Sequence, residues 1–162
     1  MLVRSHGGNT LRVKGFLSSR FRPPAPLVEA LINFPAIGKR HIILLIDTGA
    51  SVTALLDSDA SRFGITMDYA SKHLKLASHK VVGIGGMAET YVVEGVELRF
   101  ATEEGMEVSE TFNLHMVLHD PKTLSVEESE LVLRLPSILG RDVINRYSLL
   151  FSASRGEVYL ER

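Results

Sequence analysis

The stretch "LLIDTGAS", residues 44–51, carries a run of aliphatic residues straight into a carboxylate, a threonine and a glycine. Such a run is typical of a buried strand, where an unpaired charge is unfavourable, so Asp47 at its end needs a reason. Gly49, two residues further on, lets the backbone approach the carboxylate closely. Asp47 therefore either stabilises an ordinary turn or is placed there to take part in chemistry.

Two glycine-containing motifs follow, "VVGIGGMAET" at 81–90 and "LPSILGRDVINRY" at 135–147. The first superficially satisfies a dinucleotide-binding fingerprint, but that fingerprint requires a helix directly afterwards. The alternating, β-branched "TYVVEGVELRF" at 90–100 predicts a strand instead. We therefore expect a glycine-tipped hairpin, which is either a plain turn or a mobile flap over a site. The second motif predicts a strand-to-helix corner at which Gly140 allows close packing.

The rest of the chain is dominated by alternating patterns and short apolar runs, which are typical of strands. Helices are expected at 57–64 and after Gly140, and a polar loop is expected at 120–130. We therefore predict an all-β fold, mainly β with two short helices, built as a small barrel or sandwich. Prolines around residue 24 predict a boundary between an N-terminal arm, residues 1–25, and one domain, residues 26–162.

The composition favours one compact domain and argues against several classes of function. The 162 residues are 45% hydrophobic, which is enough for a sizeable core. A net charge of −1 argues against a nucleic-acid partner, and the absence of cysteine excludes disulfides and thiolate metal sites. No stretch has the apolar length of a signal peptide or a membrane span, so a soluble, cytoplasmic protein without a membrane partner is expected.

His115 and His119 are spaced by four, which on a helix can form a metal site with Asp120 alongside. The stretch "FNLHMVLHD" at 112–120 predicts a strand, however, where two such side chains share a face but lie too far apart for easy chelation. We therefore expect neither a metal nor any other cofactor.

Taken in order, the Asp-Thr-Gly-Ala segment, the glycine-rich hairpin tip and the Ile-Leu-Gly-Arg-Asp segment resemble those of the retropepsin-like aspartic peptidases. The resemblance runs from about residue 26 to the C-terminus. It implies a closed acid-protease barrel, one lobe per chain, in which each lobe supplies one catalytic aspartate. Because the chain has a single Asp-Thr-Gly, the resemblance implies a homodimer with two Asp47 side chains together on its symmetry axis.

The resemblance also implies a mechanism and a role for individual residues. Two neighbouring carboxylates share one proton, so the ionised one activates a water while the protonated one donates to the peptide carbonyl. The substrate is then a peptide or an unfolded protein, which pairs with the flap by strand addition. The residues matched to catalysis are Asp47, Thr48 and Gly49. Those matched to substrate binding are Ala50, Gly83, Ile84, Gly85 and Gly86, and those matched to support of the site are Leu139, Gly140, Arg141 and Asp142.

The chain departs from the family pattern at two positions near the catalytic segment. Retroviral members usually have an acid at the position of Ser51, and it pairs with the arginine that Arg141 matches. Here that ion pair is either absent or formed with another acid, such as Asp57 or Asp142. Ala50 stands where pepsin-like relatives have a hydroxyl that stabilises the charged carboxylates, so we expect activity at mildly acidic to near-neutral pH.

Three hypotheses remain open at this level. The first is an aspartic endopeptidase that works as a homodimer, which an intact Asp47-Thr48-Gly49 favours. The second is a retropepsin-fold dimer that binds extended peptides without cutting them. In the third, the N-terminal arm, which like the insert at 102–135 exceeds a minimal family member, blocks the cleft, so trimming residues 1–25 would raise activity.

Overall fold

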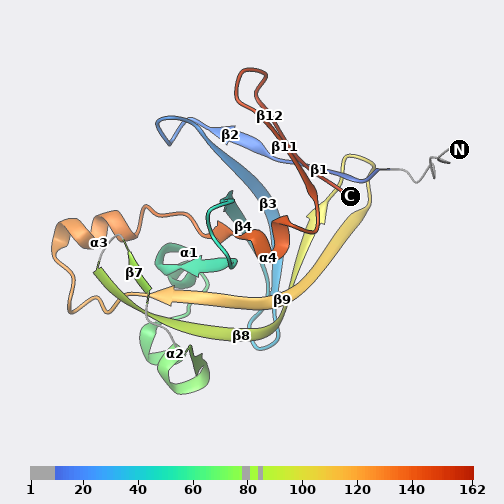
Figure 1. Ribbon diagram of the computed structural model, residues 1–162. Helices are drawn as coiled ribbons and strands as arrows, with labels where there is room; N and C mark the ends of the chain where they lie inside the picture. Colours follow the sequence, from blue (N-terminus) through green and yellow to red (C-terminus); the bar gives the residue numbers. More distant parts are fainter. Residues whose placement is uncertain (1–9, 78–80, 84–85) are drawn as a thin grey trace, which may run out of the picture.

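The computed structural model describes residues 10–77, 81–83 and 86–162, which form twelve strands and four short helices (Figure 1). The helices are α1 (Asp57–Arg62), α2 (Met67–His73), α3 (Val126–Val132) and α4 (Arg141–Ile144). The strands are β1 (Arg12–Lys14), β2 (Phe16–Ser18), β3 (Ala25–Phe34), β4 (Gly38–Ile46), β5 (Ala54–Leu56), β6 (Lys75–Leu76), β7 (Val81–Gly83), β8 (Gly86–Ala101), β9 (Glu107–Leu118), β10 (Ile138–Leu139), β11 (Ser148–Ser152) and β12 (Glu157–Glu161).

Most of the described strands belong to one sheet that closes on itself. Its order is β2-β3-β4-β10-β5-β9-β8-β6, and β7 pairs with β8. A further antiparallel pairing joins β3 to β8, with Ile32 opposite Leu98. Because β4, β10, β5 and β9 otherwise separate these two strands, the pairing completes a ring. The predicted mainly β fold class is therefore confirmed.

The long strand β8 can serve both the hairpin and the barrel because it contains a bulge. Its register against β9 shifts between Val93 and Val96, where Gly95 has a φ of 68° that favours glycine. The part before the bulge pairs with β6 and β7, and the part after it pairs with β3. In Figure 1, β8 and β9 accordingly run side by side as the two longest arrows.

The short strand β10 brings the third sequence motif beside the first. It lies between β4, to which it is parallel, and β5, to which it is antiparallel. Leu139 is opposite Ile46, the last residue of β4, while Ile138 is opposite both Leu45 and Ala54. The segments 44–51 and 135–147 therefore meet where β4 ends.

The chain passes at Gly15 from a second sheet, in the order β1-β12-β11, into the barrel. The backbone N–H of Gly15 donates to the carbonyl of Val158 at 2.8 Å. A Cβ at Gly15 would lie 2.6 Å from the carbonyl oxygen of Leu27, so glycine is required by the close approach. Both β1 and β2 lie within the expected N-terminal arm, and the division at residue 25 stays a prediction.

The core lies inside the ring, where alternate residues of the strands point inward. Along β9, the residues at even positions from Val108 to Leu118 are buried while most of those between them are exposed. The largest fully buried side chains come from strands of the ring and from the second sheet. Those of the ring are Tyr91, Phe100, Ile32, Ile42, Leu44, Leu55, Leu98, Leu114, Met116 and Leu139, and those of the second sheet are Leu160 and Val13. The site is therefore carried on a rigid, well-packed frame.

Helices form at the two expected places, as α1 and α4, and also at two others. α2 follows Thr66, whose hydroxyl accepts a hydrogen bond from the backbone N–H of Tyr69 at 3.1 Å. α3 follows Ser125, which forms a capping box with Glu128. The prediction of a polar loop at 120–130 is therefore wrong over its second half, and "SVEE" carries the capping signal that it missed.

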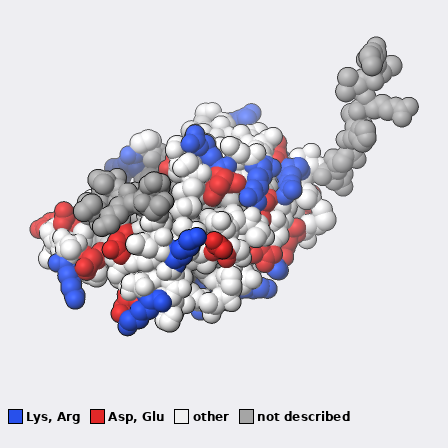
Figure 2. Space-filling model, turned by 60° about the horizontal axis from the view of Figure 1, so that its bottom comes forward, with Lys and Arg blue, Asp and Glu red and all other residues white. Residues whose placement is uncertain are grey.

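The surface of the described molecule mixes charges of both signs. Figure 2 shows Lys and Arg side chains interspersed with Asp and Glu on the face that it presents. Within the described ranges, no helix is long and apolar enough to cross a membrane.

Candidate active site

Asp47 begins the turn that follows β4. Its backbone N–H donates to the carbonyl of Leu139 at 3.1 Å, which ties the turn to β10. Its carboxylate oxygen Oδ1 accepts from the backbone N–H of Gly49 at 2.9 Å, and its carbonyl accepts from Ala50 at 3.2 Å. A Cβ at Gly49 would lie 3.1 Å from Oδ1, so a side chain there would crowd the carboxylate. The turn thus fixes one carboxylate oxygen in place.

The predicted catalytic residues lie at the surface of the isolated chain. Asp47 and Ala50 are half-buried, while Thr48 and Gly49 between them are exposed. Thr48 can therefore reach a group that a second molecule presents to it.

A buried network behind the turn holds the three motif-bearing segments together. The hydroxyl of Thr53 donates to Asp142 Oδ1 at 2.7 Å and accepts from the backbone N–H of Gly140 at 3.0 Å. The backbone N–H of Thr53 donates to Asp142 Oδ2 at 3.0 Å. Asp142 also accepts from the N–H of Val143 in the first turn of α4. The structure thus brings Gly140 and Asp142, both predicted to support the site, into direct contact with the segment after Asp47.

Gly140 lies against the backbone of the same segment. A Cβ at Gly140 would be 2.3 Å from both the carbonyl carbon and the carbonyl oxygen of Val52. The next residue, Arg141, donates its backbone N–H to the carbonyl of Ala50 at 2.9 Å. Close packing, which the sequence suggested for Gly140, is therefore what the position requires.

The two acids considered as partners for Arg141 have other partners. Asp142 accepts from Thr53, and Asp57 contacts His119. Across the described residues, no acidic side chain forms an ion pair with Arg141. Within one chain, Asp57 and Asp142 therefore do not rebuild the ion pair that Ser51 lacks.

The expected glycine-tipped hairpin is formed by β7 and the start of β8. Val81 is opposite Ala88, and Gly83 is opposite Gly86 at the last described pair. Ile84 and Gly85, which were predicted to contact the substrate, lie outside the described residues. At the base of this hairpin the hydroxyl of Tyr91 donates to Glu89 at 2.5 Å. Burial and this hydrogen bond raise the pKa of Tyr91 to about 12, so the hydroxyl stays protonated and keeps the bond.

A cavity of about 460 Å³, here called the cleft cavity, lies beside the turn that begins at Asp47. The turn contributes residues 49–52, with Ala50 among the residues predicted to bind substrate. The other walls come from β5, β10, the end of β4, the end of β9 with the residue after it, the start of α1, the start of β8 and the segment before β10: Leu45, Ala54, Leu56, Asp57, Ala88, Val117, His119, Leu135, Pro136 and Ile138. The cleft cavity is large enough for a peptide side chain and mainly apolar.

The sequence did not predict that His119 and Asp57 would pair. His119 Nδ1 lies 2.7 Å from Asp57 Oδ2, and the backbone N–H of His119 donates to Asp57 Oδ1 at 2.8 Å. No grouping of acidic and histidine side chains in the described part of the chain is arranged to hold a metal ion. In the sequence, only the spacing from His115 singled out His119. Its partner in the structure is Asp57, which lies 62 residues earlier in the chain.

The fold is similar to those of solved proteases. A retropepsin-like aspartic protease from Rickettsia conorii aligns over 99% of this chain and 97% of its own, with 19% identity and a TM-score of 0.51. The retroviral protease-like domain of Ddi1 from Leishmania major aligns over 84% of this chain and 93% of its own, with 14% identity and a TM-score of 0.46. No family model matches the chain, and no curated protein matches it. The first comparison confirms the predicted retropepsin-like fold.

Proposed function

We propose that this chain, which has a retropepsin-like fold, is an aspartic endopeptidase whose active site forms when two copies bring their Asp47 carboxylates together. The observation that carries the proposal is the placement of Asp47. Its carboxylate is held by the N–H of Gly49 in a surface turn, and the next residues of that turn, 49–52, line the cleft cavity. A carboxylate fixed in a turn that lines a mainly apolar cavity is typical of a catalytic site.

In this proposal the second carboxylate comes from Asp47 of a second copy of the chain. Asp57 and Asp142, the acids that follow the turn in sequence or in space, are engaged with His119 and Thr53. The exposed position of Thr48 and Gly49 leaves the turn accessible to a symmetry-related turn. In a C2 dimer the same surface meets itself, so one Asp47 would face the other.

The proposed reaction needs only these two carboxylates and a water molecule. The ionised carboxylate takes a proton from the water while the oxygen of that water attacks the peptide carbonyl carbon. The protonated carboxylate donates its proton to the carbonyl oxygen, which gives a tetrahedral intermediate. When the C–N bond breaks, the carboxyl that took the proton of the water gives it to the departing nitrogen, and the other carboxylate takes a proton back from a hydroxyl of the intermediate as the new carboxyl group forms. The pair therefore ends with one shared proton, as it began.

The substrate in this proposal is an extended peptide or an unfolded protein. The hairpin of β7 and β8 offers backbone groups near the cleft cavity, and strand addition would align a peptide along it. The residues behind the turn, Gly140 and Asp142, act by holding its backbone in place.

The cytoplasmic location expected from the sequence stays a prediction.

Cleavage of an unfolded protein by wild type and by Asp47→Asn, from about pH 2 to pH 8, tests the proposal. We expect the wild type to cut and Asp47→Asn, which cannot ionise, to lose the activity. Because Ala50 donates no hydrogen bond to the charged carboxylates, we expect activity to extend to mildly acidic or near-neutral pH. A profile with a sharp maximum near pH 2–3 would contradict the role of Ala50, and cutting by Asp47→Asn would contradict the mechanism.

The alternative, a dimer that binds extended peptides without cutting them, is decided by the same proteins. If the wild type cuts no substrate, the mass in solution and the binding of labelled peptides are measured. A dimer that binds peptides without cleaving them supports the alternative. A strict monomer has no carboxylate pair and excludes the proposed enzyme.

A further inference from the structure

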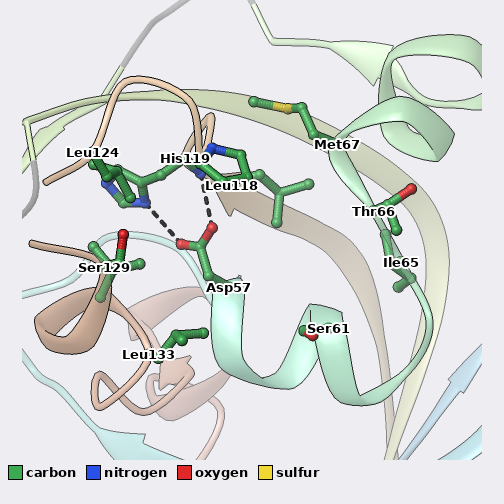
Figure 3. Close-up of a pocket in the computed structure, with 12 residues that line it drawn as sticks. Asp57, Ser61, Ile65, Thr66, Met67, Leu118, His119, Leu124, Ser129 and Leu133 are labelled. Atoms are coloured by element: carbon green, nitrogen blue, oxygen red, sulfur yellow. Dashed lines mark hydrogen bonds and ion pairs between the residues drawn. The ribbon is translucent and has the colours of Figure 1, made fainter. Parts of the chain in front are cut away.

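The cleft cavity includes a side-chain pair that the proposed mechanism does not use. Asp57, the first residue of α1, and His119, directly after β9, lie 2.7 Å apart at their closest atoms. The His119 side chain is 6% exposed and that of Asp57 is 15% exposed. Figure 3 shows the imidazole and the carboxylate facing each other, with both hydrogen bonds between the two residues drawn. The pair is therefore largely shielded from solvent and held together by two hydrogen bonds.

One nitrogen of His119 has no hydrogen-bond partner among the described residues. Nδ1 faces the carboxylate of Asp57, and in the tautomer whose Nδ1–H donates to that carboxylate the other ring nitrogen, Nε2, is a hydrogen-bond acceptor. Nε2 is buried, and no described residue donates to it. A buried polar atom without a partner is unfavourable, so Nε2 calls for a hydrogen-bonding group that the described part of the chain does not supply.

The same two residues line two neighbouring cavities. They belong to the cleft cavity and to a second cavity of about 280 Å³, which Figure 3 shows. Most of the other residues that line the cleft cavity are apolar. They include Leu56 of β5, Val117 opposite it on β9, and Ile138 of β10. A side chain that enters the cleft cavity thus meets apolar groups along its length and one polar pair.

From this arrangement we infer that the cleft cavity is a subsite for a side chain with an apolar stem and an uncharged hydrogen-bond donor at its end, such as glutamine. The donor would satisfy Nε2 of His119. Asp57 holds the ring by its other nitrogen, and its negative charge disfavours an acidic side chain nearby. Because Nε2 is shielded, the inference includes a small outward shift of the cavity wall when the side chain enters. It rests on the proposed function, since it concerns how the same cleft selects peptides.

The test uses sets of peptides in which one residue near the scissile bond is varied. The varied position is moved from one residue of the peptide to the next, so that each position is tested in turn. Glutamine is compared with methionine, which has a similar length but no donor, and with glutamate, which has no donor and a negative charge. At one position we expect wild type to prefer glutamine over methionine about tenfold or more in kcat/KM, with glutamate the poorest. Equal rates for glutamine and methionine at all positions, or a preference for glutamate, would overturn the inference.

His119→Asn separates recognition from a merely structural role. The asparagine amide can still donate to Asp57 in place of Nδ1, but it has nothing at the position of Nε2. We expect the melting temperature to stay close to that of wild type while the preference for glutamine over methionine falls to about one. His115→Asn is the matched control, because His115 lies on β9, the strand that His119 directly follows, but lines neither cavity, and it should keep the preference. A preference that survives in His119→Asn would overturn the inference.

Binding to Asp47→Asn distinguishes failure of this inference from failure of the proposed function. The same peptides, labelled for fluorescence anisotropy, are bound to Asp47→Asn and to Asp47→Asn with His119→Asn. If wild type cuts nothing but glutamine peptides bind about tenfold more tightly only when His119 is present, the subsite holds and the peptidase proposal fails. If no peptide binds, or the two variants bind alike, the subsite is refuted regardless of the catalytic result.

Discussion

Thr53 positions the proposed catalytic turn through one side chain. Its hydroxyl donates to Asp142 and accepts from the N–H of Gly140, and Thr53 is only 1% exposed. Water therefore cannot replace these hydrogen bonds if the hydroxyl is lost. The sequence predicted Gly140 and Asp142 as supporting residues but not Thr53, because their contacts join positions 87 to 89 residues apart that only the folded chain brings together.

Thr53→Val tests this link. Valine keeps the shape of threonine but leaves the N–H of Gly140 without a partner and removes one of the two hydrogen bonds to Asp142 Oδ1, the other coming from the N–H of Val143. We expect the free energy of unfolding, measured with urea, to fall by about 2–3 kcal/mol. Thr53→Ser keeps the hydroxyl and removes one methyl group, so it should cost about 1 kcal/mol. Equal stability of the two variants would show that the hydroxyl is not important.

At the scale of elements, β10 determines where the turn lies. This two-residue strand is held between β4 and β5, and the chain leaves it through Gly140 against the backbone of Val52. The corner could be predicted because a glycine between an apolar pair and a helix start is a local pattern. The insertion of β10 between β4 and β5 could not, because β10 pairs with strands that lie more than 80 residues earlier in the chain, with Ile138 opposite Leu45 and Ala54.

Gly140→Ala should disrupt this corner. Its Cβ would lie 2.3 Å from backbone atoms of Val52, which cannot move as a side chain would. We expect a loss of about 3 kcal/mol or more in the free energy of unfolding, together with loss of any cleavage activity. Gly156→Ala is the comparison, since Gly156 has open space around it and a φ of 67°, so only backbone strain of about 1 kcal/mol is added. Similar losses in both variants would argue against the close approach at Gly140.

At the scale of the whole molecule, Glu110 connects the barrel to the second sheet, β1-β12-β11. This buried residue of β9 accepts from Arg146 at 2.6 Å, from the hydroxyl of Tyr147 at 2.6 Å and from Arg162 at 2.8 Å. Burial alone would raise the pKa of Glu110, but the hydrogen bonds from Tyr147 and Arg146 and the two positive charges outweigh it, so the pKa is lowered. No sequence pattern indicated this cluster, because Glu110 simply occupies an inward position in a strand.

Glu110→Gln should reveal a pH-dependent contribution to stability. Because the pKa is lower in the folded than in the unfolded chain, the stabilisation is present above the ordinary value near 4.5 and is lost as pH falls through the lower folded-state pKa. We expect the variant to be about 2–4 kcal/mol less stable than wild type at pH 7, with the gap shrinking below about pH 4.5. Glu107→Gln, at the exposed start of the same strand, should change stability by about 0.5 kcal/mol or less. A gap that does not vary with pH would contradict the charged role of Glu110.

A site shared by two Asp47 side chains is tested most directly by mixing subunits. Wild type and Asp47→Asn are combined at constant total concentration, allowed to exchange, and assayed for cleavage. If each site needs both carboxylates, activity falls with the square of the wild-type fraction, so an equal mixture retains about one quarter of the pure wild-type rate. If activity instead falls in direct proportion, to about one half in the equal mixture, each chain cuts alone and the shared site is refuted.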